Sequence, residues 1–240
     1  MAQMVESLRV ASVDRSEVLR YLGYHGQELT PELEGRLDAV VERCLQTARP
    51  RACLRQFCIK GRGKTADGMP EVVLDGCSLR LAGTSMQEHL QGAVAVGVMA
   101  VTIGADIERE LRRLALVDPL EQVMFDAAAT AVVERAADAA EARLVSLGAE
   151  QNLHANWRFS PGYGDLPLAC QVELLASLDA TRHLGITLTP SLLMVPTKSV
   201  TAVVGYFTEP RHGARPGCGT CNLREWCTIR AHGDTCHKGV

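Results

Sequence analysis

The chain has 240 residues, of which 47% are hydrophobic, and a formal net charge of -3 at pH 7. A chain of this length can bury a sizeable core in one large domain or two small ones. The charge gives no reason to expect nucleic acid as a partner. The amino-terminal residues lack the apolar stretch of a signal peptide, and the longest apolar run, residues 92–101, is too short to cross a bilayer. We therefore expect a cytoplasmic protein that binds neither nucleic acid nor a membrane.

The first third of the chain changes from helical to strand-like patterning. A short helix is expected over residues 16–22. A longer helix follows, since Thr30 is a typical N-cap residue and Pro31 is favoured at the first helical position. Residues 53–81 contain short apolar runs separated by glycines, which indicates strands and turns.

Two capping signals mark the middle of the chain. A capping box that begins at Ser85 predicts a short helix, followed by a strand over residues 97–104. A similar signal at Asp118 opens a long alanine-rich helix, which should stop at Gly148 because glycine favours helix ends. The alanines would let another element pack closely against this helix.

The last predicted elements complete an α+β pattern. Residues 168–184 predict a helix, and residues 186–207 predict two or three strands rich in β-branched residues. We expect a single α+β domain over residues 1–210, with a mixed or antiparallel sheet flanked by helices and a helical amino-terminal part over residues 1–50. A cysteine-rich appendix, residues 211–240, should follow it.

The appendix contains four of the nine cysteines of the chain. They have the spacing Cys-x2-Cys-x5-Cys-x8-Cys, and nearby glycines would let the backbone fold tightly around a metal. Four thiolates suit either zinc or an iron–sulfur cluster, and nearby histidines offer replacement ligands. The spacing matches neither common ferredoxin pattern, so zinc, an iron–sulfur cluster and no metal all remain open. The predicted metal ligands are Cys218, Cys221, Cys227 and Cys236.

The loop NWRFSPGYGDLPLAC, residues 156–170, contains several polar, charged and turn-forming residues between two helical segments. An arginine such as Arg158 can donate two parallel hydrogen bonds to a carboxylate. The turn at Pro161 and Gly162 lets a backbone approach a ligand, and Tyr163 adds an aromatic face that attracts cations, including a sulfonium. The alternative is a surface arginine followed by an ordinary turn with a packed tyrosine.

The segment Arg158-Phe-Ser-Pro-Gly-Tyr resembles the Arg-Pro-x-Pro-Gly-Tyr signature of the activation domain of cobalamin-dependent methionine synthase. Residues 96–104 and 188–210 resemble the same domain in order and spacing, so the likeness covers about residues 78–210. The amino-terminal segment VLRYLGYHGQ resembles the opening of free-standing versions of that domain.

This resemblance implies a specific chemistry. In the family, the reactive cobalt(I) of cobalamin is occasionally oxidised to an inert cobalt(II) form. The activation domain binds S-adenosylmethionine and presents its methyl group to the cobalt while an electron arrives, which traps the cobalt in methylated form. The protein would thus be the methyl-transferring activation component of a cobalamin-binding methionine synthase chain. A flavodoxin- or ferredoxin-like protein would be the electron donor, with the cysteine-rich appendix as a further possible entry point.

The resemblance also assigns roles to individual residues. Arg158 would bind the carboxylate of the ligand and Glu134 its ammonium group, although Glu134 is equally well interpreted as an ordinary exposed helix carboxylate. The neighbouring backbone would contact the adenosyl part, and Tyr163, the predicted catalytic residue, would lie between ligand and corrin. The predicted ligand-binding residues are Glu134, Arg158, Ser160, Pro161, Gly162 and Tyr163.

One residue departs from the family signature, and one motif for cobalamin binding is absent from the sequence. Phe159 stands where the signature has its first proline. The chain also lacks the Asp-x-His-x-x-Gly element through which histidine ligates cobalt, so we expect cobalamin to be supplied by a partner. Two other functions remain open: a non-catalytic module that binds S-adenosylmethionine or the corrinoid protein and carries a structural zinc tail, and a small iron–sulfur electron carrier.

Overall fold

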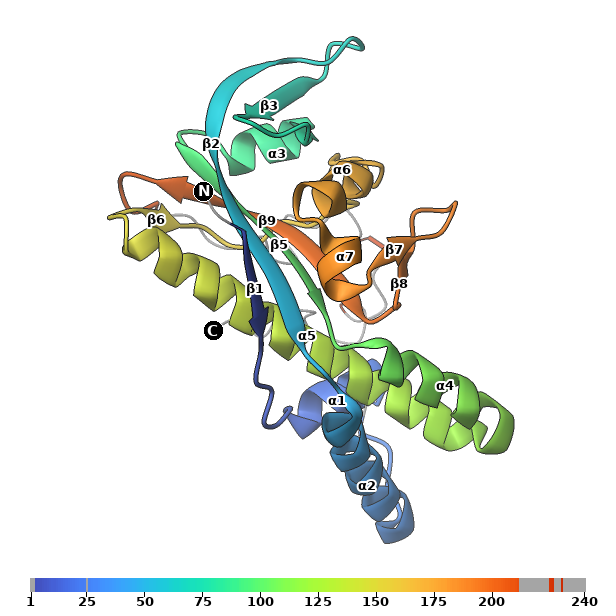
Figure 1. Cartoon of the computed structure of the whole chain (residues 1–240). Coiled ribbons are helices and arrows are strands. Elements are labelled where there is room, and N and C mark those ends of the chain that lie inside the picture. Colours follow the sequence, from blue (N-terminus) through green and yellow to red (C-terminus); the bar gives the residue numbers. More distant parts are fainter. Residues whose placement is uncertain (1–2, 25, 212–224, 227–229, 231–240) are drawn as a thin grey trace.

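The computed structural model describes residues 3–24, 26–211, 225–226 and 230. Its strands are β1 (Met4–Ser7), β2 (Arg51–Lys64), β3 (Pro70–Leu74), β4 (Arg80–Ala82), β5 (Ala95–Thr102), β6 (His154–Ala155), β7 (Thr187–Leu188), β8 (Met194–Val195) and β9 (Ser199–Phe207). A seven-stranded sheet has the order β4-β3-β2-β5-β9-β6, with β1 beside β2, and β7 and β8 form a separate pair (Figure 1). All of these pairings are antiparallel, so of the two predicted kinds of sheet the antiparallel one is found.

Helices cover both faces of this sheet. They are α1 (Arg15–Tyr21), α2 (Pro31–Thr47), α3 (Thr84–His89), α4 (Ala105–Val117), α5 (Pro119–Ala149), α6 (Cys170–Ser177) and α7 (Ala180–Leu184). The long helix α5 crosses one face, where α1, α2 and α4 gather near its amino-terminal half, and α6 and α7 lie on the other face (Figure 1). Each face has its own hydrophobic core. The predicted α+β fold class is therefore confirmed.

Local sequence signals account for several element boundaries. The side chain of Thr30 accepts a hydrogen bond from the backbone N–H of Leu33 at 3.3 Å, which caps α2 as predicted. Asp118 caps α5 in the same way. Strand β5, which includes most of the predicted strand 97–104, has every residue buried because it lies between β2 and β9 with helices on both faces.

Gly148 does not end the long helix, contrary to the prediction. Helix α5 continues through it to Ala149. A Cβ atom at Gly148 would lie 2.6 Å from Cε1 of Tyr206, a fully buried residue of β9. Gly148 therefore permits close packing between helix and sheet because it has no side chain. It does not adopt the left-handed backbone angles that also favour glycine.

Other elements also differ from the sequence expectation. The single helix predicted over residues 168–184 is divided into α6 and α7 by Asp179, whose φ of 43° lies in the left-handed region. Helix α4 and strand β1 were not predicted. The buried residues of α4, Ile107, Leu111 and Leu114, do recur at helical spacing, so the pattern for that helix is present in the sequence.

Candidate functional site

The segment that carries Arg158 is fastened to strand β9. Phe159 donates its backbone N–H to the carbonyl of Val203 at 2.8 Å, and Val203 donates back at 2.9 Å. The buried side chain of Asn156 accepts a hydrogen bond from the backbone N–H of Gly205 at 2.7 Å. The backbone on both sides of Arg158 is therefore held by the sheet, which fixes where its side chain begins.

The guanidinium of Arg158 reaches three carboxylates on helix α5. Nη1 donates to Asp138 and to Glu141, each at 2.6 Å, and Nη2 donates to Glu134 at 3.0 Å. Residues 134, 138 and 141 recur at helical spacing and share one face of α5. The structure thus brings together the predicted pair of Arg158 and Glu134, and adds two acidic residues that sequence analysis missed.

Glu141 accepts hydrogen bonds from both the backbone and the side chain of Arg158. One of its oxygens accepts a hydrogen bond from the backbone N–H of Arg158 at 3.1 Å, and the other binds the guanidinium. The side chain of Glu141 is 7% exposed and that of Arg158 is 18% exposed. A buried carboxylate is favourable only with such charged and hydrogen-bonded partners, so Glu141 and Arg158 form the enclosed part of the cluster.

The acidic surroundings also determine the protonation of Arg158. Burial by itself would lower the pKa of Arg158, but the hydrogen bond to Asp138 and the charges of Glu141, Asp138 and Glu134 more than offset it and raise the pKa above its ordinary value. The guanidinium is therefore permanently charged.

A tight turn follows the arginine. Tyr163 donates its backbone N–H to the carbonyl of Ser160 at 3.2 Å, and Gly162 donates to that of Leu166 at 3.0 Å. Gly162 has a φ of 88°, a conformation that strongly favours glycine. Pro161 is buried, whereas Tyr163 is 66% exposed. The turn therefore presents an aromatic ring at the surface, close in sequence to the arginine.

Asp165 ties this turn to helix α3. Its carboxylate accepts hydrogen bonds from the backbone N–H groups of Thr84 at 2.7 Å and Ser85 at 2.9 Å. Partial desolvation would raise the pKa of Asp165, but these hydrogen bonds outweigh it and hold the pKa below its usual range. The short helix predicted near Ser85 is present, but the predicted capping box is wrong. The N-cap residue of α3 is Gly83, which has no side chain to cap the helix, and Asp165 accepts hydrogen bonds from the first amides of α3 instead.

The C-terminal end of α3 supports the same loop through His89. The His89 ring is 6% exposed and packs against Trp157 and Phe159, with ring centroids 5.4 Å and 5.0 Å apart. Its Nε2 atom is buried and has no hydrogen-bond partner among the described residues. Burial, and secondarily the charge of Arg211, lower the pKa of His89 to about 4, although a backbone hydrogen bond at Trp157 opposes them. A neutral imidazole therefore packs beside the two residues that flank Arg158.

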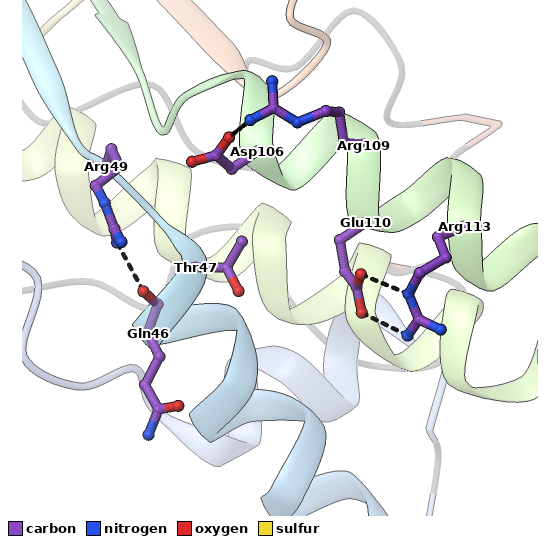
Figure 2. A pocket seen from close by; sticks show the side chains of 7 residues that line it. All are labelled: Gln46, Thr47, Arg49, Asp106, Arg109, Glu110 and Arg113. Atoms are coloured by element: carbon purple, nitrogen blue, oxygen red, sulfur yellow. Dashed lines mark hydrogen bonds and ion pairs between the residues drawn. The ribbon is translucent and has the colours of Figure 1, made fainter.

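A polar pocket of about 500 Å³ lies elsewhere, between helices α2 and α4 (Figure 2). Its arginines are already engaged by the protein: Arg109 with Asp106, Arg113 with Glu110 at 2.8 Å, and Arg49 with backbone carbonyls. None of the predicted ligand-binding residues lines it. We therefore place the candidate site at the Arg158 cluster, not in this pocket.

The predicted metal ligands, Cys218, Cys221, Cys227 and Cys236, lie outside the described residues. Within the described part of the chain, no group of histidine, cysteine and acidic side chains has an arrangement that suits a metal ion.

No helix in the described part of the chain has both the length and the apolar character needed to cross a membrane.

Comparisons with known proteins identify the family. Residues 82–213 match the model of the family described as vitamin B12 dependent methionine synthase, activation domain. Since this match spans more than half of the 240 residues, the chain belongs to that family. The resemblance noted in the sequence is thereby confirmed.

A solved structure supports the same fold. The chain is similar to the crystal structure of the MetH reactivation domain bound to AdoHcy, with a TM-score of 0.61 and 17% sequence identity. The similarity covers 98% of this chain and 86% of the other. A comparison with curated proteins found no match.

Proposed function

We propose that this activation domain binds S-adenosylmethionine at the Arg158 cluster and the adjoining turn, and presents it to the cobalamin of a methionine synthase partner. The main support is the direct ion pair between Arg158 and Glu134 beside an exposed glycine–tyrosine turn, in a member of this family. The two charged groups have the signs that the carboxylate and ammonium of an amino-acid ligand require.

The donor set fits such a ligand. A guanidinium has five N–H donors, and the three bonds to the acidic side chains of α5 use three of them. The remaining donors, on Nη2 and Nε of Arg158, suit the ligand carboxylate. Glu134 has 42% of its side chain exposed, so one of its oxygens can accept a hydrogen bond from the ammonium group.

The turn fits the adenosyl part and the methyl donor. Of the residues that the structure describes, a Cβ atom added at Gly162 would meet only Leu168 within 4 Å, at 3.6 Å, so a ligand can approach this backbone closely. Ser160 and Pro161 complete the backbone of the turn. The exposed ring of Tyr163 would lie against the sulfonium and be covered by the docked partner, which excludes water there. When bound, S-adenosylmethionine supplies the methyl group that is transferred to the partner's cobalt as an electron arrives.

The cysteine-rich tail would serve this function by holding a metal. The four thiolates of Cys218, Cys221, Cys227 and Cys236 suit either an iron–sulfur cluster, which would pass electrons to the cobalt, or a structural zinc ion. Metal analysis and the absorption spectrum of anaerobically purified protein separate the two, because only the cluster absorbs visible light. A metal content unchanged by replacing all four cysteines with serine would contradict this assignment.

Calorimetric titration with S-adenosylmethionine tests the binding site. Glu134→Gln removes a charge-assisted hydrogen bond, and Arg158→Lys keeps the charge but loses the planar fork; each should weaken binding about tenfold or more. The matched control is Glu42→Gln, at an exposed carboxylate on α2 that accepts a hydrogen bond from Gln46. Thermal melting checks that each variant is folded. Equal affinity in wild type and both site variants would refute the assignment.

A reactivation assay tests the role of the turn. A cobalamin-dependent methionine synthase with oxidised cobalt is mixed with the protein, S-adenosylmethionine and a chemical reductant, and recovery of activity is followed. Tyr163→Ser should slow recovery while leaving the melting temperature unchanged, because the ring is largely exposed. Recovery at the wild-type rate would remove Tyr163 from the proposed mechanism.

A further inference from the structure

The Arg158 cluster has more negative than positive charge. Three carboxylates surround one guanidinium, so these four groups have a formal net charge of −2. Among the described residues, Arg135 adds a further cation, 3.8 Å from Asp138 and with 62% of its side chain exposed. Counting Arg135 as well, the cluster remains negative.

Burial divides the cluster into two parts. Glu141 and Arg158 are the enclosed pair, and their opposite charges cancel. Glu134 and Asp138 have 42% and 47% of their side chains exposed, so the uncompensated negative charge faces outward. A ligand that approaches the guanidinium therefore meets an outward-facing negative potential.

This potential distinguishes the methyl donor from its product. S-adenosylmethionine has a carboxylate, an ammonium and a sulfonium, and therefore a net charge of +1. Loss of the methyl group converts the sulfonium to a neutral thioether, so S-adenosylhomocysteine has a net charge of zero. The two molecules otherwise share the same groups, and a negative site can separate them by charge.

We propose that Asp138 is a specificity-determining residue that makes the site prefer the cationic methyl donor over its neutral demethylated product. Glu141 acts as a positioning residue, because it holds Arg158 and neutralises its charge, so that Glu134 and Asp138 keep the site negative even with Arg135 counted. The inference rests on the proposed function. Its consequence is that the product leaves the site more readily than the donor, which favours turnover.

The test is calorimetric titration of the full chain with three probes: S-adenosylmethionine, S-adenosylhomocysteine and sinefungin, a cationic analogue that cannot transfer a methyl group. The wild type should bind both cationic probes more tightly than the neutral one. Asp138→Asn should reduce this preference about fivefold, the size expected for one half-exposed charge, with little change for S-adenosylhomocysteine. Glu42→Gln, on α2, should leave the preference unchanged.

The outcomes separate this inference from the function on which it rests. Equal affinities of the wild type for all three probes would overturn the inference while leaving the binding site in place. A loss in Asp138→Asn that is the same for charged and neutral probes would also overturn it, since it would indicate a merely structural role. Absence of binding of any probe to the wild type would overturn both. Raising the salt concentration should diminish the preference, because salt screens half-exposed charges.

Discussion

Acid should destabilise the protein through His89 before most carboxylates titrate. The imidazole is buried among aromatic rings, where burial lowers its pKa to about 4. In the unfolded chain the usual value is about 6.5. As the pH falls below 6.5, the unfolded state binds a proton that the folded state does not accept. The stability due to neutral His89 is therefore fully present above pH 6.5 and is lost progressively down to pH 4.

The magnitude follows from the two pKa values. The difference between about 6.5 and about 4 corresponds to about 3 kcal/mol in total, or about 1.4 kcal/mol per pH unit within that interval. This is a substantial fraction of the stability of an ordinary domain. Protonation would also place a charge beside Trp157 and Phe159, which flank Arg158, so the loop that carries Arg158 should loosen along with the fold.

Urea unfolding at pH 7.5, 6.0 and 5.0 measures this effect. The wild type should lose stability across the series, whereas His89→Leu should show a flatter dependence, because leucine does not titrate. His154→Gln, a substitution at an exposed histidine, should retain the wild-type slope. An equally steep slope in His89→Leu would refute the assignment of the acid sensitivity to His89.

Three further substitutions test the packing of the fold and of the site. Gly148→Ala should cost about 1–3 kcal/mol in urea unfolding, since its Cβ would lie 2.6 Å from the ring of Tyr206. Gly35→Ala lies within helix α2, and no atom of the described part of the chain would be within 4 Å of the new Cβ, so it should instead stabilise by about 0.5–1 kcal/mol. Equal effects of the two substitutions would contradict the packing argument. Asp165→Ala should cost about 1 kcal/mol and speed hydrogen exchange at the first amides of α3, and unchanged exchange would show that the cap is unimportant.

The sequence indicated the family because the signature around Arg158 consists of consecutive residues, and because residues 96–104 and 188–210 resemble the same domain in order and spacing. The ion pair of Glu134 with Arg158 requires a helix long enough to bring Glu134 beside the loop, and that helix was also predictable. The participation of Asp138 and Glu141 was not predicted, although their helical spacing from Glu134 is visible in the sequence. Helical periodicity places these residues on one face of α5. Only the pairing of the loop with β9 determines that Arg158 contacts that face.

The sequence by itself determined the α+β class and the starts of helices α2 and α5, because their caps are formed by residues adjacent to the helix. Tertiary structure decided the features that depend on distant residues. The first amides of α3 are bonded by Asp165, about 80 positions away in the chain, and Gly148 is required by the ring of Tyr206. Local patterns report hydrogen bonds within a turn or helix, whereas these contacts arise only when the sheet and the helices pack together.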